Sequence, residues 1–343
     1  MKAFPLFFLR WLAAPAACLL LAGCGEKAPQ TTVTADGRKL TKVTVQTDWY
    51  AQPEHGGFYQ ALVKGYYRDA GLDVTINQGG PNIVPLQRVA LGQLEFAIGR
   101  SDDLSVAVER GLPVVMVGAL MQRDPQAIVF HQGSGIKSFK DLNGRSIMTV
   151  PGSNFLLLLE KKYGIKVSVL PLDMGLSRFL ADPQFIQQCF ITNEPYYLRK
   201  MGANPGTLLL SDMGFAPYRV WFTSREFAAK NPETVRAFTA ATIRGWSDYL
   251  TGDRTAADQM ISALNKHLTP EFNDYCVGVM RDAKLVAGDP AQGEAVGRID
   301  PSRIETLLKQ LTDIGIITKP LKVADVFDDR FLPDDVRVKP ATK

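Results

Sequence analysis

Short apolar strands alternate with helical segments through most of this 343-residue chain, and this alternation constrains its fold more than any other feature. Strands and helices that follow one another at short spacing favour βαβ units, in which the strands lie mainly parallel in one sheet. A chain of this length exceeds one comfortable hydrophobic core, so two domains are expected. We therefore predict an α/β fold. The expected strands span 43–47, 72–76, 96–99, 114–120, 145–150, 167–170, 187–191 and 207–210.

The first residues are typical of an export signal. Lys2 and Arg10 are the only charges in residues 1–23, and residues 11–21 form an apolar run too short to span a bilayer comfortably. The run ends in Leu-Ala-Gly-Cys, which resembles the bacterial lipobox, in which Cys24 becomes the lipidated first residue of the mature chain. A chance cysteine after an ordinary cleavage site is the alternative. We expect a lipid-anchored protein of the bacterial cell envelope, facing the periplasm or the cell exterior.

The loop after the first strand, residues 48–59, carries a dense set of recognition groups. In an open α/β sheet, ligands bind beyond the carboxyl ends of the strands, where loops lead into helices. Trp49 and Tyr50 offer flat faces that can stack on a heteroaromatic ring, and Asp48 can accept hydrogen bonds from an exocyclic amine. His55 completes the set. The alternative is a core tryptophan whose polar neighbours solvate the turn.

The net charge and the cysteines exclude several classes of protein. Removal of the signal peptide takes away two basic residues and lowers the formal net charge from +4 to +2, too little to indicate a nucleic-acid partner. Outside the signal and Cys24, only Cys189 and Cys276 remain, which is no disulfide framework. Cys189 lies in an apolar run and is expected to be a buried thiol.

Several short stretches stand out together: Asp48-Trp49, HGGFY at 55–59, KGYYRDAGLDV at 64–74, GQLEFA at 92–97, SFKDLNG at 138–144 and NPE at 231–233. With these stretches the chain resembles the substrate-binding proteins of ABC importers in the nitrate/sulfonate/taurine-like superfamily, and most closely its thiamine-pyrimidine-precursor branch. The resemblance covers roughly residues 43–250.

The resemblance implies the type II periplasmic-binding-protein fold, in which two α/β lobes joined by two crossovers close on a small ligand. Such a protein delivers its ligand to an ABC permease and its ATPase, performs no chemistry, and needs no cofactor or metal. We expect a monomer, with crossovers near 129–132 and 218–223. The expected division is 1–23 signal peptide, 24–41 flexible tether, 42–130 first part of lobe 1, 131–220 lobe 2, and 221–343 return to lobe 1 with C-terminal helices.

Four loops at strand ends should converge on the cleft. In the family an acidic residue commonly faces the ligand at the turn that Glu194 occupies, although a first-turn Glu also complements the helix dipole. The loop at 151–155 places backbone N–H groups at a helix start, which suits an acceptor group or simply marks a capped helix. The expected ligand-binding residues are Asp48, Trp49, Tyr50, His55, Arg100, Ser101, Ser153, Asn154, Asn193, Glu194 and Tyr197.

Two acids facing one cleft suit a pyrimidine or related nitrogen heterocycle with amino donors, because a sulfonate or nitrate would be desolvated beside like charges. Arg100 opposes this reasoning unless it neutralises Asp102 or Asp103, and capping of the following helix explains Ser101 equally well. An alkylsulfonate, nitrate or other small anion is therefore the alternative ligand.

Two other classes remain open. A eukaryotic pyrimidine synthase shares the superfamily's fold, but its cysteine-rich iron-linked motif is not visible here. The three histidines, His55, His131 and His267, form no cluster with metal-ligand spacing in the sequence, and we predict no catalytic residue. A lipoprotein that senses its ligand instead of delivering it is the third possibility.

Overall fold

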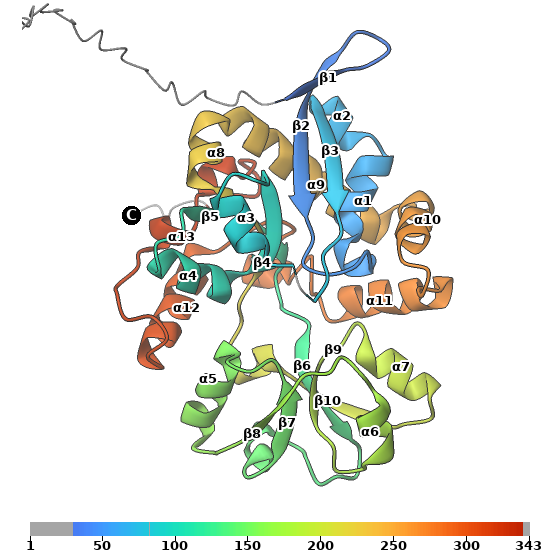
Figure 1. The fold of residues 1–343 in the computed structure, drawn as a ribbon, viewed down its shortest axis with the longest axis vertical. Helices are drawn as coiled ribbons and strands as arrows, with labels where there is room; N and C mark the ends of the chain where they lie inside the picture. Colours follow the sequence, from blue (N-terminus) through green and yellow to red (C-terminus); the bar gives the residue numbers. More distant parts are fainter. Residues whose placement is uncertain (1–29, 82, 339–343) are drawn as a thin grey trace, which may run out of the picture.

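The computed structural model describes residues 30–81 and 83–338, which form two α/β lobes, each built on its own sheet (Figure 1). The expected signal peptide, Cys24 and the first part of the expected tether lie outside these residues. Within the described ranges, no helix is both long and apolar enough to cross a membrane.

The larger lobe contains a six-stranded sheet with the order β1-β2-β4-β11-β5, and β3 also pairs with β2. β2 is parallel to β3 and β4, whereas β11 runs antiparallel to both β4 and β5. The loop after β2 therefore leaves the carboxyl end of a parallel strand, as the sequence indicates. The strands are β1 (Thr31–Val33), β2 (Lys39–Gln46), β3 (Leu72–Asn77), β4 (Phe96–Arg100), β5 (Val114–Met121) and β11 (Arg219–Ser224).

The smaller lobe contains a five-stranded sheet with the order β10-β6-β9-β7-β8. β7 is parallel to β8 and β9, and β6 runs antiparallel to β9 and β10. Its strands are β6 (Gln126–His131), β7 (Ser146–Thr149), β8 (Ser168–Pro171), β9 (Gln187–Phe190) and β10 (Pro205–Leu209).

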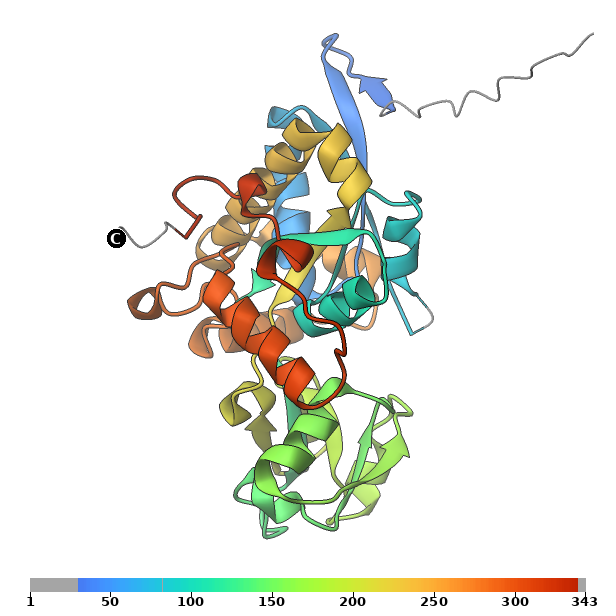
Figure 2. The same ribbon diagram turned by 90° about the vertical axis from the view of Figure 1, so that its left-hand side faces the viewer.

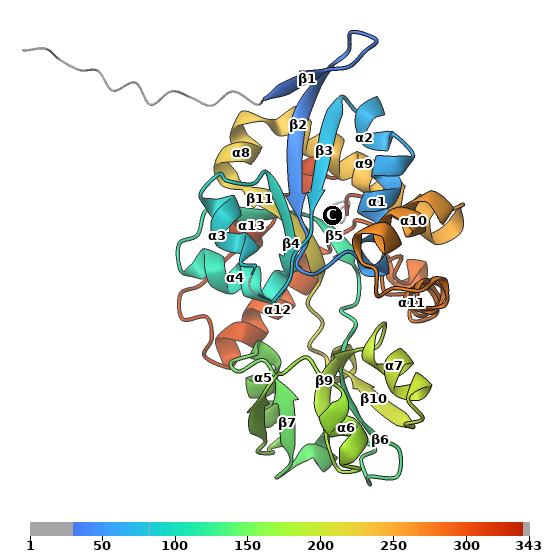
Figure 3. The same cartoon turned by 45° about the vertical axis from the view of Figure 1, so that its right-hand side comes forward.

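Ten helices of the described residues pack with the larger lobe and three with the smaller lobe (Figures 1 and 3). Those of the smaller lobe are α5 (Asn154–Tyr163), α6 (Ser177–Ala181) and α7 (Glu194–Lys200). Those of the larger lobe are α1 (Gly56–Val63), α2 (Tyr66–Asp69), α3 (Pro85–Ala90), α4 (Ser101–Glu109), α8 (Arg225–Lys230), α9 (Pro232–Thr251), α10 (Thr255–Leu264), α11 (Pro270–Asp282), α12 (Pro301–Asp313) and α13 (Val323–Val326).

The two crossovers lie earlier in the chain than the sequence indicates. β6 pairs with β9 and β10, so the chain leaves the larger sheet at 122–125 and not at residue 130. It returns before β11, whose pairing with β4 and β5 places residues 219–224 inside the larger sheet. Strands such as 126–131 and 219–224 would show the same sequence pattern in either sheet. Only their pairing with distant strands decides to which lobe they belong.

The expected flexible tether at 24–41 is wrong over its described part. Residues 31–33 form β1 and pair antiparallel with residues 39–41 at the start of β2. The hydroxyl of Thr32 also donates to the Asp73 carboxylate at 2.7 Å. A three-residue strand in a polar segment shows no periodicity, so no local pattern predicts this hairpin.

A residue of α12 braces both crossovers. The guanidinium of Arg303 donates to the carbonyl of Gln122 in the first crossover at 2.5 Å and to that of Ala216 in the second at 2.7 Å. It also lies over the Tyr218 ring, 3.9 Å from the centroid. Figure 2 shows α12 extending from the larger lobe toward α5 of the smaller lobe. The C-terminal helices therefore hold the two connections between the lobes at a fixed spacing.

Close contact between α1 and α9 fixes the start of α1 and with it the loop at 48–55. A Cβ added at Gly57 would lie 2.2 Å from the Trp246 ring, and one added at Gly56 would lie 2.1 Å from the Tyr249 ring. On the opposite helix, a Cβ at Gly245 would lie 2.3 Å from the Gly57 carbonyl oxygen. The Gly-Gly pair after His55 is thus a packing requirement.

Gly57→Ala should destabilise the fold by about 1–3 kcal/mol, because the buried Trp246 ring cannot yield without disturbing the core. Gly278→Ala is the matched control, since its Cβ would meet nothing within 4 Å inside α11. That change should stabilise by about 0.5–1 kcal/mol through helix propensity. Urea unfolding of both variants tests this contrast, and equal effects would contradict the assigned α1–α9 contact.

Candidate functional site

A cavity of about 400 Å³ lies between the two lobes. Its volume falls in the range typical of small-molecule sites. The polar lining residues are Asp48, Gln52, Glu54, His55, Gln187, Gln188, Asn193, Glu194 and Arg219. The remaining lining residues are Trp49, Leu120, Met121, Pro125, Val150, Leu172, Met174, Leu176, Phe190 and Tyr197.

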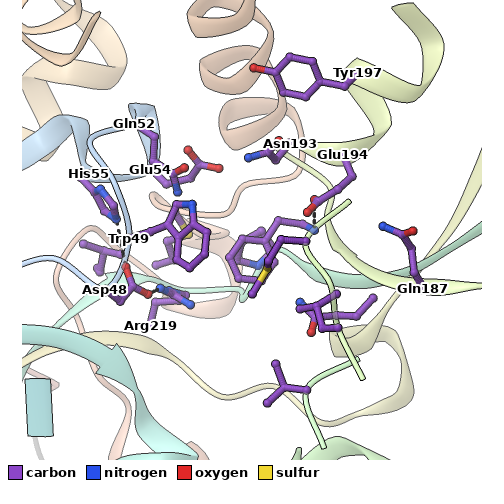
Figure 4. A pocket seen from close by; sticks show the side chains of 18 of the residues that line it. Asp48, Trp49, Gln52, Glu54, His55, Gln187, Asn193, Glu194, Tyr197 and Arg219 are labelled. Atoms are coloured by element: carbon purple, nitrogen blue, oxygen red, sulfur yellow. Dashed lines mark hydrogen bonds and ion pairs between the residues drawn. The ribbon is translucent and has the colours of Figure 1, made fainter. Parts of the chain in front are cut away.

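Six of the eleven residues expected from sequence line this cavity (Figure 4). Three come from the loop after β2 in the larger lobe, and three come from the start of α7 in the smaller lobe. The two groups therefore approach the cavity from opposite lobes. They are Asp48, Trp49 and His55 on one side and Asn193, Glu194 and Tyr197 on the other.

The other five expected residues, Tyr50, Arg100, Ser101, Ser153 and Asn154, do not line the cavity. Tyr50 is 48% exposed and packs edge-on against Trp49, with ring centroids 5.5 Å apart. The hydroxyl of Ser153 donates to the carbonyl of Val150 at 2.7 Å, and no side-chain cap forms at the start of α5.

Ser101 neither caps α4 nor faces the cavity. Its hydroxyl accepts from the Tyr218 backbone N–H at 2.9 Å, and its own backbone N–H donates to the Tyr218 carbonyl at 2.9 Å. Ser101 is fully buried by this exchange. It therefore joins the start of α4 to the second crossover, which is a structural role.

Arg100 is engaged in a network of ion pairs within the chain. Its guanidinium lies 3.0 Å from the Asp102 carboxylate and 3.5 Å from that of Asp124 in the first crossover. The Asn154 side-chain amide, from the smaller lobe, donates to Asp102 at 3.0 Å and to Asp103 at 3.2 Å. These residues connect the lobes beside the cavity and leave Arg100 committed to carboxylates of the chain.

Asp48 is held by two neighbours. The His55 Nε2 lies 3.1 Å from Asp48 Oδ1, and Arg219 of β11 forms an ion pair with Asp48 Oδ2. Burial lowers the pKa of His55 to about 4, so the imidazole is neutral at physiological pH and donates its single N–H to the carboxylate. Burial also lowers the pKa of Arg219 to about 10, which still leaves it charged at physiological pH.

Two lining residues present acceptors that no N–H or O–H group of residues 30–81 and 83–338 satisfies. Glu54 is 4% exposed, and neither of its carboxylate oxygens receives a hydrogen bond from such a group. The Gln187 Oε1, in the smaller lobe, is likewise buried without a partner within that part of the chain. Buried polar atoms are usually hydrogen-bonded, so unsatisfied acceptors in a cavity indicate where a ligand donor would fit.

Glu194 lies at the first turn of α7 and receives one hydrogen bond, from the Phe190 backbone N–H at 2.8 Å. Burial raises the pKa of Glu194 to about 7, and repulsion from Glu54 contributes in the same direction. The Phe190 hydrogen bond opposes this rise. The site thus places two carboxylates close enough to repel each other.

Aromatic rings stand on both sides of the cavity. Trp49 belongs to the larger lobe and Phe190 to the smaller lobe. The guanidinium of Arg219, from β11 of the larger lobe, lies 5.5 Å from the Phe190 ring centroid. Tyr197 is stacked on Phe272 of α11, with centroids 5.2 Å apart, which fixes its ring at the border of the two lobes. A flat ligand between the lobes would find aromatic faces on each side.

The cavity is acidic overall. It contains the carboxylates of Asp48, Glu54 and Glu194 and a single permanently charged cation, Arg219, which is already paired with Asp48. Within residues 30–81 and 83–338, no group of three or more His, Cys, Asp or Glu residues is placed to hold a metal ion. The free capacity of the site is therefore hydrogen-bond acceptance beside aromatic surface.

Sequence reasoning missed several lining residues. Gln52 and Glu54 lie in the loop that it selected, but nothing in the sequence distinguishes a buried carboxylate from a solvated one. Arg219 was a detectable signal, because it is a single charge inside the apolar run at 218–223. Gln187 is a weaker signal, a polar residue at the start of β9 that is buried like Cys189 two residues later.

The comparisons with known proteins identify the family. The NMT1/THI5-like family model matches residues 52–256, more than half of the chain. The chain belongs to the NMT1/THI5-like family. It is 26% identical to the riboflavin-binding protein RibY of Chloroflexus aurantiacus, over 92% of this chain and 95% of RibY. It is 25% identical to the formylaminopyrimidine-binding protein of Halalkalibacterium halodurans, over 91% of this chain and 95% of that protein.

A third relative carries the name of an enzyme. The 4-amino-5-hydroxymethyl-2-methylpyrimidine phosphate synthase THI11 of Saccharomyces cerevisiae is 26% identical, over 72% of this chain and 82% of the yeast protein. The family therefore includes proteins named for binding and proteins named for synthesis.

Solved structures show that the fold is that of periplasmic binding proteins. The alkanesulfonate-binding protein SsuA of Xanthomonas axonopodis pv. citri superposes with a TM-score of 0.62 at 14% identity, covering 84% of this chain and 98% of that one. The periplasmic sulfonate-binding protein SsuA of a sulfonate ABC transporter from Methylobacillus flagellatus gives a TM-score of 0.60 at 14% identity, covering 85% and 93%. At these identities the likeness shows the fold, and the expected type II architecture is confirmed.

Glu194→Gln should change how stability depends on pH. Because the folded-state pKa of about 7 exceeds the ordinary 4.5, the wild type loses stability as pH rises from about 4.5 to 7. At about 1.4 kcal/mol per pKa unit, the loss amounts to about 3.5 kcal/mol. Glutamine does not ionise and avoids this loss. The free energy of unfolding of the variant, relative to that of the wild type, should therefore rise between pH 4 and pH 8.

Urea unfolding of wild type and Glu194→Gln at pH 4 and pH 8 measures this gain. The lowered pKa of His55 makes stability rise with pH over this range, which is the opposite direction. This contribution is common to both proteins and cancels when their free energies of unfolding are subtracted. A stability difference that stays constant between the two pH values would show that Glu194 is not desolvated in the free protein.

Proposed function

We propose that this protein captures a pyrimidine or related nitrogen heterocycle with amino donors and delivers it to an ABC permease. The observation that carries the proposal is the excess of unsatisfied acceptors in the cavity, led by the two Glu54 oxygens and Gln187 Oε1. Amino groups and ring N–H groups supply the donors that these atoms lack.

The aromatic residues support a flat ligand. A ring bound beside Trp49 would stack on the indole, and Phe190 offers a second face from the other lobe. Two relatives whose names describe binding of a pyrimidine and of riboflavin, both nitrogen heterocycles, align over nearly their whole length with this chain.

The site disfavours an anion such as a sulfonate or nitrate. An anion would have to be desolvated beside Glu54 and Glu194, while Arg219 is already neutralised by Asp48. The sulfonate-binding structures share the fold at 14% identity, which says nothing about the ligand of this chain.

Binding without chemistry is the form of the proposal that the alignments with relatives favour. The relatives named as binding proteins align over 95% of their own length, whereas the yeast synthase aligns over 82% of its length. We further propose attachment to the cell envelope through a lipid on Cys24, on the strength of the Leu-Ala-Gly-Cys run. The intact mass of the mature N-terminus tests this anchor.

Titration calorimetry with 4-amino-5-hydroxymethyl-2-methylpyrimidine and with ethanesulfonate tests the proposal. The wild type should bind the pyrimidine and not the sulfonate. Glu194→Gln replaces an acceptor oxygen by a donor and removes a charge-assisted hydrogen bond of about 1.5–3 kcal/mol, so pyrimidine affinity should fall tenfold or more. Trp49→Ala should weaken binding by a comparable amount through lost stacking and burial.

Tyr50→Ala is the matched control, because it removes the adjacent aromatic side chain that lies outside the cavity. It should lower affinity far less than Trp49→Ala does. Pyrimidine affinity that is unchanged in Glu194→Gln, or sulfonate binding that becomes tighter, would contradict the proposed ligand class and leave the fold assignment intact.

A further inference from the structure

Glu54 is the most unusual group in the cavity. It lies in a short 3₁₀ turn at Pro53–His55, is 4% exposed, and receives no hydrogen bond from any N–H or O–H group of the described residues. In Figure 4 its carboxylate extends into the space near Gln52 and Asn193. A buried carboxylate normally has a cation or several donors around it, because leaving it alone costs several kcal/mol.

No cation of the cavity lining is available to Glu54. Arg219 is engaged by Asp48, and burial keeps the imidazole of His55 neutral. Two further neighbours do not neutralise Glu54: Glu194 repels it, and the buried thiol of Cys276 in α11 is only a weak hydrogen-bond donor to it. Glu54 belongs to the larger lobe and Glu194 to the smaller one, so the two carboxylates line the cavity from opposite lobes.

We infer that Glu54 is a ligand-binding residue and that the ligand class is cationic: a ring bearing an amidinium-type group, such as an aminopyrimidine protonated on a ring nitrogen. This inference rests on the proposed function and narrows it. A planar N–H donor pair with positive charge matches a carboxylate in a two-bond arrangement. A second donor on the same ligand can reach Glu194 or the unsatisfied Gln187 Oε1.

The positions of the two acids also connect binding to closure. In the absence of a cation their repulsion opposes approach of the lobes, and a cation between them replaces repulsion by two attractive contacts. A ligand shifts a conformational equilibrium only by its differential affinity for the two states. Here the closed arrangement of the lobes would have the higher affinity, because only in it do both lobes contact the ligand.

Two probes of the same shape and different charge test the inference: pyrimidine-2-carboxamidinium, a cation, and pyrimidine-2-carboxamide, which is neutral. Calorimetry at pH 7.5 should give the wild type at least tenfold tighter binding of the cation. In Glu54→Gln this preference should fall by tenfold or more, whereas Glu54→Asp, which keeps the charge, should retain part of it. Glu305→Gln makes the same charge change at an exposed site on α12, outside the cavity, and should leave the preference unchanged.

A third probe, 4-amino-5-hydroxymethyl-2-methylpyrimidine, separates failure of the inference from failure of the proposed function. Binding of this probe without a preference for the amidinium, or with a preference that survives Glu54→Gln, would overturn the inference alone. A wild type that binds neither the aminopyrimidine nor the amidinium would overturn both. Urea unfolding of Glu54→Gln checks its fold, and removal of an unpaired buried charge should leave its stability equal or higher.

Discussion

The binding site depends on two buried carboxylates that no basic side chain of the described cavity lining neutralises. Glu54 and Glu194 are held at the interface of two lobes, where water is partly excluded and no basic side chain of the cavity is free for them. Desolvation of Glu194 lowers the stability of the free protein, since a buried acid ionises only at a cost, as the raised pKa of Glu194 indicates. A ligand that supplies the missing donors recovers this free energy on binding, so that affinity is gained from interactions that the empty protein lacks.

The scaffold places these acids accurately and still permits motion. On the larger lobe, the Gly-Gly pair at the start of α1 packs directly against Trp246 and Tyr249 of α9, which fixes the loop that carries Trp49 and Glu54. Between the lobes, Arg303 holds the two crossovers together through their backbone carbonyls. The fixed parts are therefore the two lobes and the spacing of their connections, and the expected closure of the lobes would be a rotation about the crossovers.

The fold class and part of the cavity lining could be predicted from sequence because they depend on local patterns. Alternating strands and helices gave the fold class, and the strand ends located Trp49, His55 and Glu194 at the cleft. The errors share a cause, which is dependence on partners distant in the chain. Asn154 contacts Asp102 across the lobes, Ser101 binds Tyr218, and the short β1 exists only through its pairing with β2.

The same limit explains which cavity residues were missed. Glu54 stands one residue from His55, but its burial depends on α11 and on the opposite lobe, which no local pattern describes. Arg219 was obscured by the apolar strand around it, although a single charge in such a strand usually has a specific partner. Pairing between distant segments, and not the chemistry of each segment, is what the sequence leaves undetermined here.

The most direct test of the central claim is native mass spectrometry of the full-length protein purified gently from its own host. The account predicts a bound small molecule that is a nitrogen heterocycle with amino donors, carried as a cation and released on denaturation. A co-purified sulfonate, nitrate or other anion would contradict the account, because the acidic cavity has no free basic group to hold it.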